Sequence, residues 1–489
     1  MKPPSSKKPR AKNAKNEETQ EPARVDPGSS RPFPVEEVAG RVLNAALNPG
    51  GDEPVPNSIE TVGCPKIPST VRRGEKVGDE IRFITDNDRV LMDLDLERVT
   101  AEIREGRSPA SFEKAGPRPM MYFNPAHLRC AVVTCGGLCP GLNDIIRSIV
   151  LELHYGYGVK TIYGVRYGLS GFIPKYGLSL VDLTPTLVRN IHSAGGTMLG
   201  SSRGEQDAGE IVDCLERESI GLLFTIGGDG TLRAATKICD EIKKRRDRIA
   251  VVGVPKTIDN DIYLVERSFG FDTAVEMATA AIRSAHTEAE GFPNGVGLVK
   301  LMGRNAGFIA ASATLAQQDV NFALIPEVDF DIDGEKGLIS ALEKRLAARR
   351  HAVIVVAEGA GQRFFTKEEE ARDPSGNVKL KDIGIFLRDR ITAHFKENKR
   401  ELNLKYIDPS YMIRSLPANA NDTVFCSALA RNAVHAGMAG KTRALVGYWK
   451  GEFVHVPMDA STGHRKQINP SGGLWQAVLE ATGQGDLKN

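Results

Sequence analysis

The most reactive side chains of the sequence are concentrated in one short segment, Pro255-Lys-Thr-Ile-Asp-Asn-Asp261. The segment follows an apolar run and combines a lysine, a hydroxyl, an amide and two carboxylates, a mixture that structural need alone seldom demands. Asp259 could accept a proton from an attacking hydroxyl group, and Lys256 could bind a phosphoryl group during its transfer. The segment therefore predicts a site of phosphoryl transfer.

A second segment, Thr225-Ile-Gly-Gly-Asp-Gly-Thr231, exposes a single carboxylate after another apolar run. Mg²⁺ usually takes one or two carboxylates and completes its shell with phosphate oxygens and water, so Asp229 is a candidate magnesium ligand. A simpler alternative stays open, in which Asp229 and Thr231 only form a turn and the N-cap of a helix.

A third segment, Cys135-Gly-Gly-Leu-Cys-Pro-Gly-Leu-Asn143, is a glycine-rich turn that leads from an apolar run into a helical pattern. Glycines let backbone N–H groups approach a phosphate, and the amino end of a helix adds partial positive charge. The Gly-Lys-Ser/Thr ending of a P-loop is absent. Taken alone, such a turn is as often a tight connection as an anion site.

These segments must be positioned by the regular pattern that starts at Arg129. Short β-branched runs predict strands at 130–134, 160–165, 221–226, 249–254, 297–301, 322–325 and 352–357. Between them, periodic apolar positions predict helices at 143–153, 231–244, 273–288, 336–349 and 384–397. Strands that alternate with helices indicate right-handed βαβ units and parallel sheets. We therefore expect an α/β protein with two doubly wound, Rossmann-like parallel-sheet domains, and ligands beyond the carboxyl ends of the strands. A closed eight-fold barrel is the alternative.

Composition excludes several classes of protein. The chain has 489 residues and is 41% hydrophobic, enough for two cores, and 64 basic against 62 acidic residues leave a net charge of +2. This balance does not indicate nucleic acid or an anionic membrane as a partner. Seven irregularly spaced cysteines are typical of reduced thiols, and neither a membrane-spanning run nor a secretory signal is apparent, so we expect a cytoplasmic protein. The 49 glycines are clustered, and we expect phosphate-facing loops at Gly136–Gly137, Gly195–Gly196, Gly227–Gly230 and Gly303.

The chain divides into a tail, an extension and a catalytic body. The tail has six basic residues before its first acid and lacks the apolar residues to fold alone, so we expect it to be disordered and solvated rather than bound to RNA or membrane. The predicted parts are the disordered basic tail (1–34), an N-terminal extension that packs on the body (35–128, with a helix at 35–47 and a strand at 80–85), a first α/β domain (129–261, completed by about 415–456), a second α/β domain (262–414) and a C-terminal segment (457–489).

Together the three segments resemble the 6-phosphofructokinase family, and the resemblance covers most of the chain from Cys130 to about Val456. Further matches are Gly195-Gly-Thr-Met-Leu-Gly-Ser-Ser-Arg-Gly204, Met302-Gly-Arg-Asn-Ala-Gly307, Pro326-Glu327, Ala357-Glu-Gly359 and Tyr406-Ile-Asp-Pro-Ser-Tyr-Met-Ile-Arg414. The resemblance implies Mg²⁺-dependent transfer of a phosphoryl group from ATP to the 1-hydroxyl of fructose 6-phosphate in glycolysis. It also implies a homotetramer whose substrates are small molecules.

The resemblance assigns roles residue by residue. Asp229 would hold Mg²⁺, Asp259 would be the general base, and Lys256 and Arg304 would supply positive charge around the transferred group. The ATP-binding positions would be Gly136, Gly137, Arg203, Gly204, Gly228, Asp229, Gly230 and Thr231. The sugar-binding positions would be Thr257, Ile258, Asp259, Asp261, Met302, Gly303, Arg304, Glu358, Tyr411, Met412, Ile413 and Arg414.

The family divides by phosphoryl donor, and Gly230 and Lys256 point in opposite directions. Pyrophosphate users typically have Asp at position 230, where a carboxylate would occupy and repel the α-phosphate region of ATP, and Lys at position 256. Gly230 therefore favours ATP. A subgroup of ATP users from trypanosomatids, plants and some bacteria combines Gly with Lys, and this chain looks most like that subgroup.

Two positions depart from the bacterial ATP enzymes of the family, Gly295 in place of Arg and Tyr411 in place of His. Recognition of the sugar phosphate must then depend on Arg414, and Lys300 and Lys405 are candidate helpers. Diacylglycerol and NAD kinases share a Gly-Gly-Asp-Gly-Thr loop, but they lack the Pro-Lys-Thr-Ile-Asp-Asn-Asp and Met-Gly-Arg segments. Two alternatives stay open: a pyrophosphate-dependent phosphofructokinase and a non-catalytic sugar-phosphate sensor. The intact Asp229 and Asp259 argue against a sensor, which needs neither.

Overall fold

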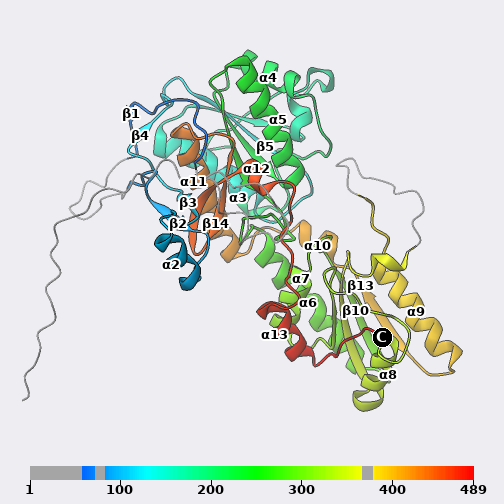
Figure 1. The fold of residues 1–489 in the computed structure, drawn as a ribbon. Coiled ribbons are helices and arrows are strands. Elements are labelled where there is room, and N and C mark those ends of the chain that lie inside the picture. Colours follow the sequence, from blue (N-terminus) through cyan, green and yellow to red (C-terminus); the bar gives the residue numbers. More distant parts are fainter. Residues whose placement is uncertain (1–57, 72–82, 366–377) are drawn as a thin grey trace, which may run out of the picture.

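The computed structural model describes residues 58–71, 83–365 and 378–489, and its framework consists of two sheets with helices on both faces (Figure 1). The predicted tail at 1–34, the predicted helix at 35–47 and the first half of the predicted strand at 80–85 lie outside the described residues. Residues 83–85 are described and form no strand, so that part of the prediction is wrong.

The larger sheet has nine strands in the order β2-β3-β15-β14-β9-β8-β5-β6-β7. Their bounds are β2 Arg89–Leu91, β3 Ser111–Lys114, β5 Arg129–Thr134, β6 Thr161–Val165, β7 Val181–Asp182, β8 Leu222–Gly227, β9 Ala250–Pro255, β14 Ala444–Trp449 and β15 Glu452–Pro457. The five strands from β14 to β6 in this order are parallel, and the flanking strands pair antiparallel. The sheet is therefore mixed, whereas the sequence predicted a parallel sheet.

The antiparallel edge begins with a tight hairpin between β14 and β15. Its two loop residues, Lys450 and Gly451, both have positive φ, at 49° and 85°. Positive φ at both loop positions belongs to a type I′ turn, whose twist matches that of the strands it joins. This short connection reverses the chain and leaves no room for the crossover helix that a parallel neighbour would need.

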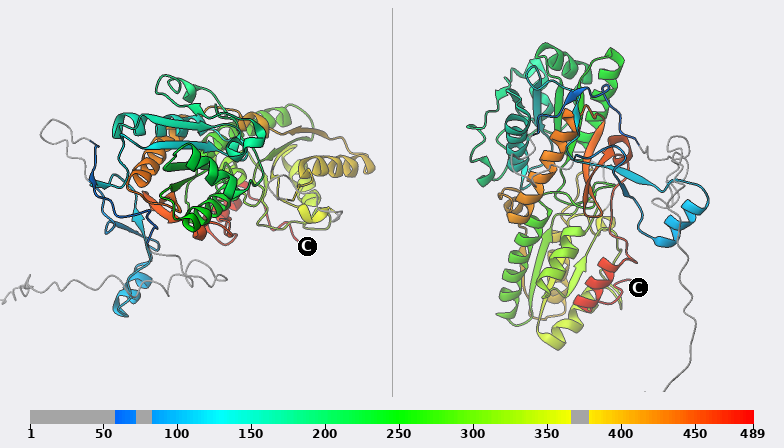
Figure 2. Two further views of the ribbon diagram at one scale, coloured as in Figure 1. Left: turned by 90° about the horizontal axis from the view of Figure 1, so that it is seen from above. Right: turned by 90° about the vertical axis from the view of Figure 1, so that its left-hand side faces the viewer.

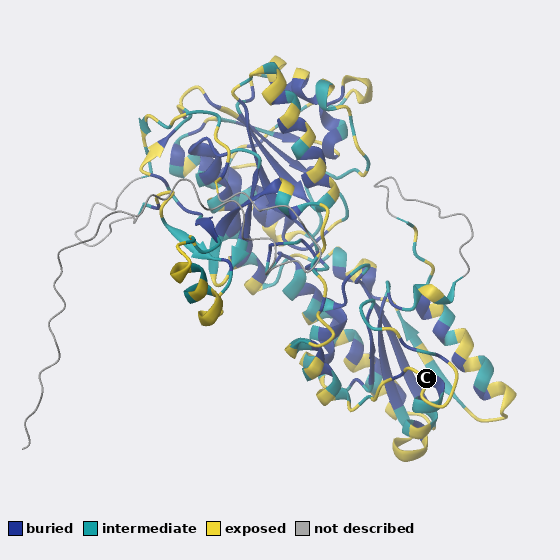
Figure 3. Ribbon diagram, viewed as in Figure 1, coloured by how far each residue is buried: buried dark blue, intermediate teal, exposed yellow. Residues whose placement is uncertain are grey.

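Helices cover both faces of the larger sheet. Successive residues of a strand point to opposite faces, so Ala131 and Val133 of β5 pack into one apolar cluster, and Cys130 and Val132 pack into another. The first cluster includes α4 (Ala208–Arg217) and α5 (Asp229–Arg245), and the second includes α3 (Leu142–Leu151) and α11 (Ala420–Met438). The central strands are therefore the most buried part of this lobe (Figure 3).

The smaller sheet has four parallel strands in the order β11-β12-β10-β13. Their bounds are β10 Gly295–Leu301, β11 Phe322–Leu324, β12 His351–Ala357 and β13 Asn403–Ile407. Helices α6 (Phe271–Glu290) and α7 (Phe308–Gln317) cover one face, and α8 (Leu338–Arg349) and α9 (Ile383–Glu397) cover the other. The two lobes follow one another along the long axis of the molecule, with α13 (Gly473–Thr482) beside α7 on the smaller one (Figure 2).

The remaining elements are short. They are the two-stranded pair β1 (Ile67–Pro68) and β4 (Met120–Met121), the helices α2 (Leu96–Arg104), α10 (Ser410–Arg414) and α12 (Met458–Ser461), the π-helical turn Glu152–Tyr157 that continues α3, and the 3₁₀ turns Gly168–Phe172, Pro174–Tyr176, Ile191–Ser193 and Gln362–Phe364. No helix in the described part of the chain is long and apolar enough to cross a membrane.

The N-terminal extension is built into the larger sheet through a buried charge network. β3 pairs with β15, and Glu113 of β3 accepts from Lys441 Nζ at 2.8 Å and lies 3.4 Å from His455 Nδ1. Although burial opposes it, these two partners lower the pKa of Glu113 to about 2. An ionised carboxylate at this depth is tolerated because its partners are buried with it.

Candidate active site

An open cavity of about 250 Å³ lies beyond the carboxyl ends of β5, β8 and β9, where the two lobes meet. This is the place where ligands bind in doubly wound sheets. Fifteen of the residues predicted from the sequence line it, namely Gly136, Gly137, Arg203, Gly204, Gly228, Asp229, Gly230, Thr231, Lys256, Thr257, Ile258, Asp259, Asp261, Arg304 and Arg414. All three segments singled out in the sequence therefore meet at one cavity.

The two carboxylates of the loop after β9 are in different environments. Asp261 is paired, because its Oδ1 accepts from Thr257 Oγ1 at 2.7 Å and its Oδ2 lies 3.1 Å from Arg465 Nη1. Asp259 Oδ2 accepts only a long bond of 3.4 Å from the backbone N–H of Arg304, and its buried Oδ1 has no hydrogen-bond partner among the described residues. Asp259 is thus the carboxylate available to a ligand.

Burial raises the pKa of Asp259 to about 7, and the negative charges of Asp261 and Glu358 act in the same direction. A carboxylate with a pKa near neutrality can accept a proton and release it again at physiological pH. When the environments of two neighbouring carboxyls differ in this way, they mark out the one suited to acid–base chemistry.

Lys256 reaches from the end of β9 toward the glycine-rich turn after β5. Its Nζ donates to the backbone carbonyl of Gly137 at 2.8 Å, and desolvation lowers its pKa. An ammonium group with little water around it interacts strongly with an incoming anion. Lys256 therefore combines a fixed position with a charge that a phosphoryl group can approach.

Asp229 stands at the first position of α5, directly after β8. Its Oδ2 pairs with Arg233 Nη2 at 3.0 Å, and its buried Oδ1 has no partner among the described residues. A buried carboxylate oxygen without a donor is costly unless a cation or donor joins it. The residues present therefore fit a magnesium ion that takes one carboxylate and leaves its other positions to phosphate and water.

The glycines at the cavity differ in what they provide. Gly136 has φ +85°, a conformation that other residues rarely adopt, and a Cβ on Gly136 or Gly137 would lie 3.6 Å from Lys256 Nζ or Arg203 Nη2 respectively. Gly195, predicted to face a phosphate, instead makes room for the backbone of Ser415, since a Cβ there would overlap the Ser415 carbonyl. That prediction is wrong: Gly195 serves chain packing.

Six of the predicted sugar-binding residues do not line the cavity, namely Met302, Gly303, Glu358, Tyr411, Met412 and Ile413. Met302 is fully buried, and its Sδ lies 3.1 Å from Arg414 Nε, so it supports a residue that does line the cavity. Ile413 is also fully buried, whereas Tyr411 is 83% exposed and Met412 64% exposed. The short helix α10 thus presents Arg414 to this cavity and turns Tyr411 to the surface.

The two candidate helper lysines have other partners. Lys300 is a residue of β10, and its Nζ lies 2.6 Å from Asp382 and 2.8 Å from Asp408. These ion pairs connect β10 to the start of α9 and to the residue that follows β13. Lys405 lies over the ring of Phe292. Neither lines the cavity, so the structure contradicts the expectation that they help Arg414 there.

Sequence reasoning missed Arg465, which enters the cavity from the C-terminal segment. Its backbone forms a bridge with Ile262, and its guanidinium pairs with Asp261. The neighbouring Lys466 donates to the carbonyls of Val265 and Glu266, which fastens the segment to the loop after β9. Because about 200 residues separate these partners, no local signal in the sequence could have indicated their contact.

Comparison with known proteins gives this geometry its context. A family model described as phosphofructokinase matches residues 129–437, which contain the three strands β5, β8 and β9 whose carboxyl ends lie at the cavity. The chain belongs to the phosphofructokinase family.

Relatives within the phosphofructokinase family are similar over most of their length. An ATP-dependent 6-phosphofructokinase of Borreliella burgdorferi is 52% identical over 378 residues, covering 76% of this chain and 85% of the relative. The ATP-dependent 6-phosphofructokinase of Trypanosoma cruzi is 44% identical over 411 residues, covering 83% of each. The ATP-dependent 6-phosphofructokinase 7 of Arabidopsis thaliana is 48% identical, covering 78% of each.

Solved structures agree on the fold. A pyrophosphate-dependent phosphofructokinase from Nitrosospira multiformis superposes with a TM-score of 0.61 at 18% identity, covering 74% of this chain and 93% of that one. At this identity the likeness bears on architecture alone. It supports the two-lobed α/β fold and excludes the closed barrel.

Proposed function

We propose that this chain is an ATP-dependent 6-phosphofructokinase, which transfers the γ-phosphoryl group of ATP to the 1-hydroxyl of fructose 6-phosphate. The relatives at 43–52% identity carry that name, and one of them is the trypanosomatid enzyme. The observation that carries the proposal is the meeting, in one cavity, of an unpaired carboxylate, a desolvated lysine, a candidate metal ligand and glycine-rich backbone.

Asp259 is the proposed general base. Its unpartnered Oδ1 would accept the hydrogen bond of the 1-hydroxyl and orient its oxygen toward the γ-phosphorus, taking the proton as the new bond forms. In a loose transfer reaction most catalysis comes from positive charge around the phosphoryl oxygens, and Lys256 and Arg304 are proposed for that role. The backbone N–H of Arg304 already contacts Asp259, and its guanidinium donates to the carbonyl of Val378.

The remaining roles follow from position. Asp229 would hold Mg²⁺, which when bound would neutralise phosphate charge. The ATP phosphates would lie along Gly136, Gly137, Arg203, Gly204, Gly228 and Thr231, and the sugar along Thr257, Ile258, Asp261 and Arg414. Arg465 is a proposed positioning residue, because it balances Asp261 and thereby fixes the loop that carries Asp259.

The choice of ATP rests on Gly230. It is the second residue of α5, and apart from its chain neighbours and the backbone of its own helix, no described heavy atom lies within 4 Å of where its Cβ would be. Helix packing therefore does not require glycine there, and glycine costs helical stability relative to alanine. Space for the α-phosphate is a reason to keep it, and an aspartate at this position would fill that space with negative charge.

We further propose a cytoplasmic homotetramer. The free state of all seven cysteines, six of them buried, suits a reducing compartment. Static light scattering of the purified chain should give four times its 53.0 kDa mass, and a monomeric mass would overturn this part of the proposal.

Product analysis tests the function. When the protein is incubated with ATP, Mg²⁺ and fructose 6-phosphate, ³¹P NMR should show a second sugar phosphomonoester that grows with ADP in equal amounts. ADP without a new sugar phosphate would indicate hydrolysis and contradict the proposal, and so would a product phosphorylated elsewhere than at the 1-hydroxyl.

A further inference from the structure

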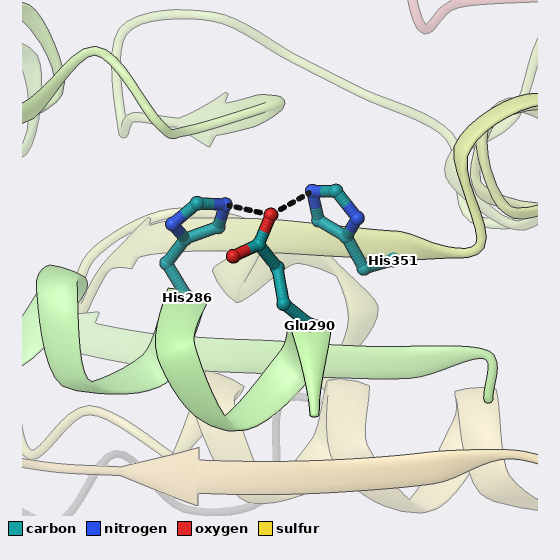
Figure 4. Close-up of side chains that lie close together, drawn as sticks. All are labelled: His286, Glu290 and His351. Atoms are coloured by element: carbon teal, nitrogen blue, oxygen red, sulfur yellow. Dashed lines mark ion pairs between the residues drawn. The ribbon is translucent and has the colours of Figure 1, made fainter. Parts of the chain in front are cut away.

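A cluster of two histidines and a glutamate lies at the opposite end of the smaller sheet from the cavity. His286 and Glu290 are one turn apart near the end of α6, and His351 is the first residue of β12 (Figure 4). β12 is parallel to β10, which leads at its carboxyl end to Arg304 at the cavity, whereas His351 lies at the amino end of β12. The length of β12, seven residues or about 23 Å, therefore separates the cluster from the cavity end of the sheet.

The Nε2 atoms of both histidine rings point toward one oxygen, Oε1 of Glu290. His286 Nε2 lies 3.6 Å and His351 Nε2 lies 4.0 Å from Glu290 Oε1, and the close-up shows both nitrogens pointing at that oxygen (Figure 4). Neither separation is a hydrogen bond, which would be about 2.7–3.2 Å. The three ligand atoms all lie within 4.8 Å of one another. They therefore face a common space rather than bind each other.

The other nitrogen of each ring faces an acceptor. His351 Nδ1 lies 3.1 Å from the carbonyl of Arg349, which requires the proton to be on Nδ1 of the neutral ring. His286 Nδ1 lies 3.6 Å from Asp319 Oδ2, an oxygen that Gln317 also holds by a bond of 2.6 Å. With its proton on Nδ1, His351 presents the lone pair of its Nε2 to the Glu290 carboxylate, and a metal cation between them would satisfy both groups.

This is the pattern of a histidine-based metal site. Metal-bound histidines almost always direct their second ring nitrogen to a carboxylate or a backbone carbonyl, which fixes the tautomer and orients the ring. Two imidazoles and one carboxylate suit Zn²⁺, whose bonds of about 2.0–2.2 Å place tetrahedral ligands about 3.3 Å apart. The present separations of up to 4.8 Å need an inward movement of the two rings and of Glu290, whose side chain is 56% exposed and has room to turn.

We propose that His286, Glu290 and His351 form a zinc site with a fourth position open to water, and that Asp319 positions His286. The site joins the end of α6 to the start of β12 and so fixes the part of the smaller lobe farthest from the cavity. Mg²⁺ and Ca²⁺ prefer oxygen ligands and should not compete there. The proposal is independent of the phosphofructokinase activity.

The test is zinc binding by the full chain after treatment with EDTA. Equilibrium dialysis against chelator-buffered Zn²⁺ should give one equivalent more for the wild-type protein than for the His286→Ala/His351→Ala variant. The exposed His127, which lies outside the cluster, provides the control, and His127→Ala should bind as the wild type does. Equal zinc content in the wild-type and the double-variant proteins would overturn the proposal.

Two further variants keep the test decisive if the double variant folds poorly. Glu290→Gln changes an exposed side chain and should remove the same equivalent of zinc, with circular dichroism unchanged. Asp319→Asn should retain the site but weaken it by about 10–100-fold, the usual effect of losing such a partner. Bound Co²⁺ should give visible absorption bands in the wild-type protein, and identical bands in Glu290→Gln would contradict the assignment.

Discussion

At the scale of single residues, chemistry in this cavity depends on contrasts between neighbours. Asp261 is held by Thr257 and Arg465, whereas Asp259, two residues earlier, has a free buried oxygen and a pKa raised to about 7. The sequence placed both carboxylates in one loop, and the resemblance named the base. The physical difference between them arises from burial and from Arg465, which no local pattern could show.

Removing the base should stop turnover without stopping binding. Asp259→Ala should lower kcat by about 10²–10⁴-fold, the usual contribution of general acid–base catalysis. Fructose 6-phosphate binding, measured by isothermal titration calorimetry, should survive. Because the raised pKa means that the fold holds the ionised form at a cost above about pH 7, Asp259→Asn should be at least as stable as the wild type at pH 8. A variant with near-wild-type kcat would refute the assignment of the base.

The raised pKa also predicts a pH profile. The base must be deprotonated to act, so kcat/KM should be level above about pH 7 and fall tenfold per unit below it. Glu358→Gln removes one of the negative charges that raise this pKa, so its acid limb should move to lower pH. An acid limb that stays in place in Glu358→Gln would contradict the electrostatic account.

Gly230 should control the use of ATP through the space it leaves. Two negative charges about 4 Å apart repel by about 4 kcal/mol at an effective dielectric constant of 20, which corresponds to roughly 10³-fold in kcat/KM. Gly230→Asp should therefore lose ATP-dependent activity by about that factor. Gly230→Ala is the matched control, since a Cβ there meets no described atom, and it should keep most of the activity. Unchanged ATP kinetics in Gly230→Asp would remove this basis for the choice of donor.

At the scale of elements, loops that follow strands form the cavity, and the C-terminal segment that contains Arg465 completes it. The segment from Arg465 to Ile468 comes from the far end of the chain. Arg465 bridges to Ile262 and Lys466 donates to Val265, which holds the loop after β9, and the backbone N–H of Ile468 donates to Glu327. The loop that carries Asp259 is thus held by strand β9, which precedes it, and by this C-terminal segment.

This arrangement predicts that Arg465 acts by position rather than by contact with the reacting atoms. Arg465→Ala should lower kcat about 10-fold or more, because Asp261 would be left as an uncompensated buried charge beside Asp259. Arg465→Lys, which keeps the charge, should recover part of the loss. Arg431→Ala, on the exposed side of α11, is the control and should have wild-type kinetics. Kinetics of Arg465→Ala equal to those of the control would disprove the role.

Elements were predictable where local pattern decides them. All seven predicted strands are present within a few residues, because buried parallel strands are continuous β-branched runs. In the two main sheets, the strands β2, β3, β7, β13, β14 and β15 were not predicted. β14 and β15 owe their pairing to the turn at Lys450-Gly451, a weaker signal than Asn-Gly, and β2 and β3 are held by tertiary contacts such as that between Glu113 and Lys441.

At the scale of the whole molecule, two sheets meet so that loops from both face one cavity. The larger lobe supplies the glycine-rich turns, Asp229 and the loop of Asp259, and the smaller lobe supplies Arg304. The sequence predicted this meeting because ligands collect at the carboxyl ends of parallel strands. The sequence could not predict that Tyr411, which lies within a motif, is exposed outside the cavity, or that the distant Arg465 lines it.

The central claim is that this molecule phosphorylates fructose 6-phosphate with ATP. The most direct test is a coupled assay of the purified chain with fructose 6-phosphate and Mg²⁺, in which the phosphoryl donor is either ATP or pyrophosphate. We predict saturable turnover with ATP and little with pyrophosphate. Turnover with pyrophosphate alone would contradict the choice of donor, and turnover with neither would contradict the claim that the cavity is catalytic.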